Sequence, residues 1–183
     1  MINLPNFLTF IRILLVPVFI VLFLVPGPVR SILSAVVFIA ASLTDLLDGY
    51  LARRWEQVTQ LGKLLDPIAD KLLVLSALIL LVQFHRVPGW IAIVLIGREL
   101  GMTGLRAIAS SDGIIIPAEK TGKYKFILQI VALVLLILDL KSQYLDFHLW
   151  GTVLLWAAMI VSIVSAVRYA VYYGNQMQMK KAG

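Results

Sequence analysis

The chain has 183 residues, of which 61% are hydrophobic, and its mean hydropathy is +0.95. About half of a soluble globular domain is apolar, so this composition excludes an ordinary water-soluble fold and predicts an all-α, polytopic membrane protein. The net charge of +6 lies mostly in short connections, which argues for membrane topology and phosphorylated substrates and against nucleic acid. The chain has no cysteine, which excludes disulfide and thiolate chemistry.

Six apolar stretches predict six transmembrane helices within a single domain, residues 1–183. In chain order the predicted helices cover residues 6–25, 31–54, 64–84, 89–110, 122–140 and 147–173. A Pro-Gly-Pro sequence ends the first helix, and Pro88 precedes the fourth.

Basic residues are unevenly distributed between the two sets of connections. The richer set consists of Arg53, Arg54, Lys63, Arg106, Lys120, Lys123, Lys125, Lys180 and Lys181. The opposite set consists of Arg30, Arg86 and Lys141. The positive-inside rule therefore predicts that both termini are cytoplasmic. For Arg106, Lys120, Lys123 and Lys125, setting the topology alone is the alternative to a role in binding.

The segment between the second and third helices reads D-x2-D-G-x2-A-R-x8-G-x3-D-x3-D. Carboxylates next to apolar helices are costly and are functional candidates. Asp45 and Asp48 are three residues apart, and Asp66 and Asp70 are four apart, so each pair shares one face of a helix. Two facing helices of this kind predict an oxygen-rich site for Mg2+ or Mn2+, with two ions. The alternative is that these carboxylates are solvated or cap helix ends.

This segment resembles the signature of the CDP-alcohol phosphotransferase family and fills all of its fixed positions. The resemblance implies an integral membrane enzyme that moves a phosphatidyl or similar group from a CDP-linked donor to an alcohol and releases CMP. It implies that Asp45, Asp48, Asp66 and Asp70 bind the metal ions, and that Asp70 is also the catalytic general base.

The same resemblance implies a CDP-binding pocket. Its residues are Asn6, Thr9, Asp48, Gly49, Ala52, Arg53 and Gly62. The small residues among them allow close approach of a nucleotide to the helix backbone, and Arg53 offers forked donors for a phosphate. The first helix also carries Arg12 within P-N-x2-T-x2-R, a sequence that resembles the start of many bacterial members.

Residues 96–125 resemble the bacterial phosphatidylglycerophosphate synthases of this family, with G-R-E, a later L-R, and G-K-x-K. The resemblance implies that CDP-diacylglycerol is the donor and glycerol 3-phosphate the acceptor. It also implies a homodimer in the bacterial inner membrane, with the active site facing the cytoplasm. Phe126 and the pair Glu119-Lys120 depart from the usual pattern.

The acceptor is a small dianion, and four cations on the predicted cytoplasmic side are available for its phosphate: Arg106, Lys123, Arg98 and Lys125. Arg106 and Lys123 are favoured because both lie at a predicted membrane boundary. Arg98 has an alternative role in a structural ion pair with Glu99.

Other interpretations of the same residues are open. Serine or inositol phosphate are alternative acceptors, and a divalent-cation transporter or a non-catalytic scaffold are alternative functions. A stripe of small residues favours close packing against another helix, for example at a dimer interface; it consists of Gly97, Gly101 and Gly104. His85 and His148 are expected to be isolated at the opposite side of the membrane.

Overall fold

We describe the protein from a computed structural model. It covers residues 4–25, 27–55, 60–114, 121–141 and 145–182, and it describes only the backbone of residues 4–9, 45–55, 60–70, 121–124 and 181–182. Within these residues the fold is all-α, as predicted, with an isolated bridge between Lys141 and Asp146. The helices are α1 (Leu4–Leu24), α2 (Pro28–Trp55), α3 (Gln60–Gln83), α4 (Gly89–Ser111), α5 (Thr121–Leu138) and α6 (Phe147–Ala182).

Two helix ends differ from the prediction by four residues or more. Helix α3 begins at Gln60 rather than residue 64, so Pro67 lies in its interior and not in its first turn. Helix α6 continues to Ala182 rather than ending at residue 173. Its last turns are rich in Gln, Met and Lys, which are good helix formers, and they contain no proline. Lys180 therefore belongs to α6 and not to a separate tail.

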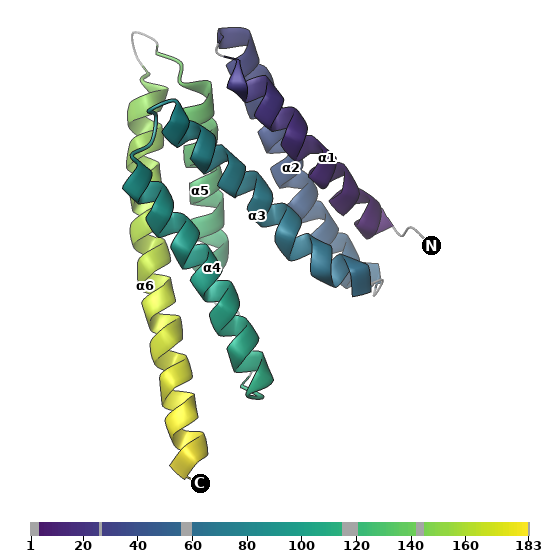
Figure 1. Cartoon of the computed structure of the whole chain (residues 1–183), viewed down its shortest axis with the longest axis vertical. Coiled ribbons are helices and arrows are strands. Elements are labelled where there is room, and N and C mark those ends of the chain that lie inside the picture. The colour runs from purple at the N-terminus through teal and green to yellow at the C-terminus, as the bar shows by residue number, and fades with distance from the viewer. Residues whose placement is uncertain (1–3, 26, 56–59, 115–120, 142–144, 183) are drawn as a thin grey trace.

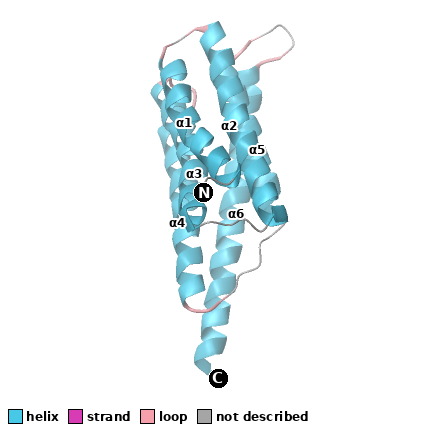
Figure 2. Cartoon of the chain, turned by 90° about the vertical axis from the view of Figure 1, so that its right-hand side faces the viewer, coloured by secondary structure: helices cyan, strands magenta, loops and turns pink. Residues whose placement is uncertain are grey.

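The six helices form an elongated bundle (Figures 1 and 2). Helix α1 packs along α2, α5 packs along α6, and α3 contacts α1, α2, α4 and α5. The end of α2, the start of α3, the end of α4 and the C-terminus are the downward-directed ends of their helices in Figure 1, although α2 ends and α3 begins near mid-height and the C-terminus lies at the bottom. The predicted aspartate and acceptor segments therefore lie on helix ends that point the same way.

The bundle has an apolar core centred on α1, α2 and α3. Phe19 and Phe38 are fully buried and their ring centroids are 5.6 Å apart. Phe23 continues this cluster, with its ring 5.7 Å from that of Phe19 and 5.4 Å from that of Phe84. At this site the helices therefore pack through large aromatic side chains from α1, α2 and the residue that follows α3.

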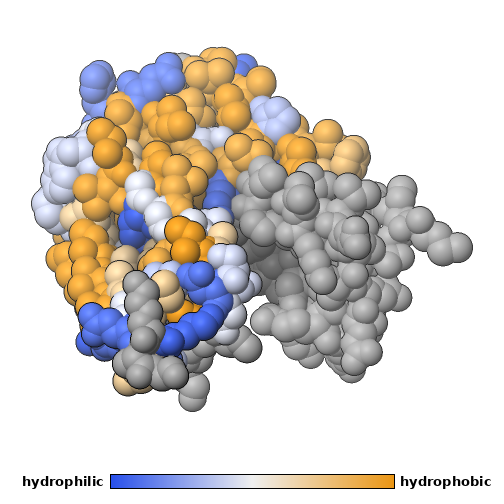
Figure 3. Space-filling model, turned by 60° about the horizontal axis from the view of Figure 1, so that its bottom comes forward, coloured by the Kyte–Doolittle hydropathy of each residue, from blue (hydrophilic) through white to orange (hydrophobic). Residues whose placement is uncertain are grey.

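The outward faces of the helices are apolar as well. Val21, Ile79 and Ile93 are each more than half exposed, and Figure 3 shows apolar residues over much of the visible face, with hydrophilic residues near its upper and lower margins. Among the described residues, one helix, Phe147–Lys180, is long and apolar enough to cross a membrane. Four shorter apolar helical stretches lie at Phe10–Leu24, Pro28–Thr44, Lys71–Gln83 and Lys125–Leu138.

Candidate active site

The four aspartates lie where α2 ends and α3 begins. Asp45 and Asp48 are in the last turns of α2, and Asp66 and Asp70 are in the first half of α3. These two helices are in contact, so the backbone brings the four positions to one region. The side chains of these four aspartates are outside the described part of the structure, so the metal site stays a prediction. The donor set fits hard divalent cations, because carboxylate oxygens are the ligands that Mg2+ and Mn2+ favour.

The predicted CDP-binding residues come from three helices. Asn6 and Thr9 are on α1, and Gly62 is on α3. The others, which are Asp48, Gly49, Ala52 and Arg53, are on the last turns of α2. Helix α1 contacts both α2 and α3. The side chains of this set also lie outside the described ones.

Arg12, the last residue of the N-terminal motif, has a described side chain. It is fully buried in α1, and it lines a small cavity together with Ser42, Val74 and Phe126, from α2, α3 and α5. Phe126, which departs from the family pattern, therefore faces the same small cavity as Arg12.

Arg98 is anchored inside the protein. Its side chain is only 7% exposed, and its Nη1 donates to Glu99 Oε2 at 2.6 Å. Its Nε donates to the main-chain oxygen of Ser162 at 3.3 Å, which ties α4 to α6. Its Nη2 is buried and has no hydrogen-bond partner among the described residues. The structural alternative for this arginine therefore accounts for two of its three side-chain nitrogens.

Arg106 has a different environment on the same helix. Its side chain is exposed, and its guanidinium carbon lies 5.5 Å from the centroid of the Tyr169 ring on α6. In the described part of the chain its donors have no hydrogen-bond or ion-pair partner. As far as the described residues show, the donors of Arg106 are available to an anion, whereas two of the three side-chain nitrogens of Arg98 are engaged. Lys125 is half-buried on α5, and the side chain of Lys123 is outside the described ones.

A contact between α3 and α4 was missed by sequence reasoning. Lys71, which directly follows Asp70, donates from Nζ to Thr103 Oγ1 at 2.6 Å. Thr103 in turn donates to the main-chain oxygen of Glu99 at 2.9 Å. This chain of hydrogen bonds connects the aspartate-bearing helix to the helix that carries both candidate arginines. The position of Lys71 beside Asp70 was the available signal.

The C-terminal part of α6 is fastened to the end of α4, also unexpectedly. Tyr173 donates from its hydroxyl to Asp112 Oδ2 at 2.6 Å, and Lys180 donates from Nζ to the main-chain oxygen of Asp112 at 2.6 Å. Asp112 follows the last turn of α4. The long extension of α6 is therefore attached to the segment that carries Arg106.

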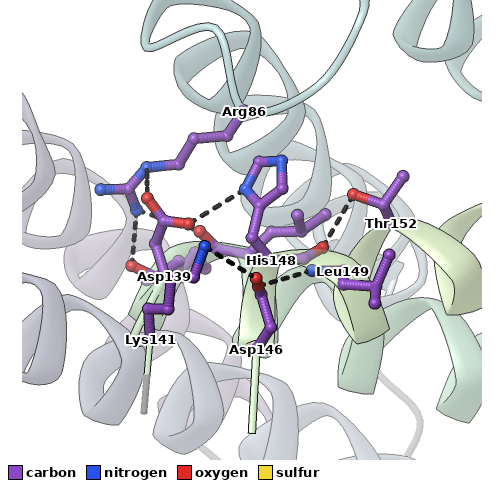
Figure 4. Close-up of polar contacts among 9 residues, drawn as sticks. Arg86, Asp139, Lys141, Asp146, His148, Leu149 and Thr152 are labelled. Carbon is purple, nitrogen blue, oxygen red and sulfur yellow. Dashed lines mark hydrogen bonds and ion pairs between the residues drawn. The ribbon is translucent and has the colours of Figure 1, made fainter. Parts of the chain in front are cut away.

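The opposite end of the bundle holds a polar cluster (Figure 4). Arg86 forms an ion pair with Asp139 at 3.1 Å and donates to the main-chain oxygens of Leu136 and Ile137, which closes the C-terminal end of α5. His148 Nδ1 lies 3.0 Å from Asp139 Oδ1. The expectation that His148 is isolated was therefore wrong, because the turn between α5 and α6 folds Asp139 back against it.

Asp146 stabilises the start of α6 at this end. The main-chain N–H of Leu149 donates to Asp146 Oδ1 at 3.0 Å, and Lys141 Nζ lies 3.6 Å from Asp146 Oδ2. These contacts favour the ionised carboxylate and lower the pKa of Asp146, the Leu149 hydrogen bond most strongly. The cluster closes helix ends, and it lies far along the bundle from the aspartate segment.

Comparison with known proteins places the chain in a family. Residues 2–164 match the family model for CDP-alcohol phosphatidyltransferase. The chain is similar to the CDP-diacylglycerol--glycerol-3-phosphate 3-phosphatidyltransferase of Bacillus subtilis, with 42% identity over 92% of this chain and 94% of that protein. It is 39% identical to the Rickettsia bellii protein of the same name, over 91% of this chain and 93% of that protein. It is 37% identical to a probable phosphatidylglycerophosphate synthase of Mycobacterium tuberculosis, over 91% of this chain and 79% of that protein. Together with the intact aspartate signature, these similarities show that the chain belongs to the CDP-alcohol phosphatidyltransferase family.

Proposed function

We propose that this protein transfers the phosphatidyl group of CDP-diacylglycerol to glycerol 3-phosphate, giving phosphatidylglycerophosphate and CMP. The observation that carries the proposal is the extent of similarity to relatives named for this reaction, at 37–42% identity over more than nine-tenths of this chain. The complete aspartate signature supports it, because a protein without catalysis has no need to keep four carboxylates beside apolar helices.

In the proposed reaction, the sn-1 hydroxyl oxygen of glycerol 3-phosphate attacks the phosphorus that carries the diacylglycerol. The bond from this phosphorus to the CMP oxygen breaks, and CMP leaves with the electron pair. Asp70 accepts the hydroxyl proton. Asp45, Asp48, Asp66 and Asp70 would hold Mg2+ or Mn2+, which when bound would neutralise phosphate charge and polarise the phosphorus.

The donor and the acceptor are proposed to meet near the downward-directed ends of α2 and α4 in Figure 1. Asn6, Thr9, Asp48, Gly49, Ala52, Arg53 and Gly62 form the proposed CDP pocket. Arg106 is our first choice for the acceptor phosphate, because its donors are unengaged within the described chain, and Lys123 and Lys125 of α5 are further candidates. Arg98 ties α4 to α6 through the Ser162 main-chain oxygen and pairs with its neighbour Glu99, and its Nη2 has no partner among the described residues.

We propose further that all six helices cross the bacterial inner membrane as one domain, residues 1–183, with both termini and the active site on the cytoplasmic side. Support comes from the basic residues, because the richly basic connections and the C-terminal end of α6 lie on helix ends that point the same way. The apolar outer faces of the helices support a lipid environment.

A homodimer is the proposed assembly, with α4 at the interface. Gly97, Gly101 and Gly104 share one face of α4 with Ile93 and Leu100, and the face is exposed in the single chain. A Cβ added at any of the three glycines meets no atom within 4 Å. A stripe of small residues allows a second helix to approach closely in a membrane.

The test is CMP release by the purified full-length protein with CDP-diacylglycerol and Mg2+. Glycerol 3-phosphate, serine and inositol phosphate are supplied separately. Turnover with glycerol 3-phosphate alone is the expected result. Turnover with a different acceptor would contradict the acceptor and keep the metal chemistry. No CMP release with any of the three, from protein that is folded and monodisperse, would overturn the enzyme assignment.

A further inference from the structure

We propose that Tyr169 on α6 is a positioning residue for the acceptor phosphate, because its ring supports the guanidinium of Arg106. The inference rests on the proposed function and extends it to a helix outside the sequence motifs. Tyr169 was not among the predicted site residues, and its role depends on how α4 and α6 lie together.

The contact between the two side chains suits this role. The guanidinium carbon of Arg106 lies 5.5 Å from the centroid of the Tyr169 ring, and this distance is within the range of a cation–π interaction. A guanidinium that rests its flat face on a ring keeps its N–H groups free at the edge. The ring therefore holds the arginine without consuming the donors that a phosphate needs.

The ring is itself held in place. Tyr169 and Tyr173 are four residues apart and so share one face of α6. Tyr173 donates to Asp112 Oδ2, and Lys180 donates to the main-chain oxygen of Asp112, both at 2.6 Å. These two bonds fasten α6 to the residue that follows α4, just beyond Arg106.

Arg98 shows the other way in which this chain positions an arginine. Its guanidinium is buried and bonded to Glu99 Oε2 and to the Ser162 main-chain oxygen. Those contacts consume donors. At Arg106 the support comes from an aromatic face instead, which is the arrangement expected for an arginine that binds substrate through its edge.

The experiment measures the KM for glycerol 3-phosphate at saturating CDP-diacylglycerol, on the full-length protein in lipid nanodiscs. The variants are Tyr169→Leu, which removes the ring, and Tyr169→Phe, which keeps it. The matched control is Tyr172→Leu, because Tyr172 is an exposed tyrosine of the same helix, and the described cation–π contact of Arg106 is with Tyr169. Tyr169→Leu is expected to raise this KM about 2- to 5-fold, the range for a partly exposed cation–π contact.

Tyr169→Phe and Tyr172→Leu are expected to keep the wild-type KM, and kcat and the KM for CDP-diacylglycerol are expected to stay unchanged in Tyr169→Leu. In an Arg106→Gln background, Tyr169→Leu is expected to add no further increase. An unchanged KM in Tyr169→Leu, or an equal increase in the Arg106→Gln background, overturns the inference. If Tyr169→Leu does not fold, the same criteria apply to Tyr169→Gln.

The two levels of the proposal fail in different ways. Wild-type protein that releases no CMP with glycerol 3-phosphate overturns the proposed function, and this inference with it. Wild-type turnover combined with an unchanged KM in Tyr169→Leu overturns only the role of Tyr169.

Discussion

Replacing Gly151 by Ala tests the packing of α6 against α5. A Cβ at this position would lie 2.8 Å from Leu136 Cγ, 3.2 Å from the Ala132 main-chain oxygen and 3.2 Å from Leu135 Cβ. Leu136 is fully buried, and the Ala132 oxygen belongs to the backbone, so neither can move aside without shifting a helix. Overpacking of this kind costs about 1–3 kcal/mol. The better helix propensity of Ala offsets about 1 kcal/mol of that, so we expect a net loss of up to about 2 kcal/mol.

The assay is thermal unfolding in detergent, followed by tryptophan fluorescence, since the chain has 4 Trp residues. Gly97→Ala is the matched control, because its added Cβ meets nothing within 4 Å in the single chain. We expect Gly151→Ala to lower the midpoint temperature of unfolding. We expect Gly97→Ala not to lower the midpoint temperature of the monomer. A midpoint for Gly151→Ala at or above that of the wild type would refute the packing argument. A lower dimer fraction in Gly97→Ala would support the proposed α4 interface.

Three further predictions concern the site and the helix ends. Asp66→Asn is expected to abolish CMP release while membrane insertion is retained; normal turnover would contradict the metal role. Thr103→Val, which removes the acceptor of Lys71 Nζ, is expected to lower kcat several-fold without unfolding the protein, and an unchanged kcat would show that the link between α3 and α4 is dispensable. The pKa of Asp146 is lowered from its ordinary value of 3.8, so its ionised carboxylate stabilises the folded protein. This stabilisation is fully present above pH 3.8 and is lost as pH falls through the pKa of the folded state. The difference in thermal midpoint between wild type and Asp146→Asn should therefore disappear in acid, and a difference that persists there would contradict this reasoning.

The order and number of the helices could be predicted because each is a long apolar run that ends at a proline, a glycine or a charged segment. The end of α6 could not be predicted from this signal. Gly174 is a typical helix terminator, yet the helix passes through it, and the Lys180 bond to Asp112 forms only after α4 and α6 have packed together. The tertiary contact and the helix-forming residues after Gly174 together outweigh the terminating preference of this glycine.

The positions of the site residues could be predicted from the sequence, but their side-chain contacts could not. The aspartate and CDP-binding positions come from a local motif, and the fold brings their helices into contact, while their side-chain roles stay predictions. The difference between Arg98 and Arg106 was not predictable, because it depends on which face of α6 each arginine meets. The Lys71 contact with Thr103 likewise joins residues that are distant in sequence.

Helix α6 is held at both ends, and this restricts how the chain can vary. Asp146 bonds to its first turn, and Asp112 receives Tyr173 and Lys180 near its last turns. Inserting one residue into an α-helix rotates everything beyond it by about 100° and advances it by about 1.5 Å. A single insertion in the middle of α6 would therefore turn Tyr169 and Tyr173 away from their partners at once. Homologues with an altered α6 length are expected to differ by whole turns, so that the angular register between the two anchors is preserved.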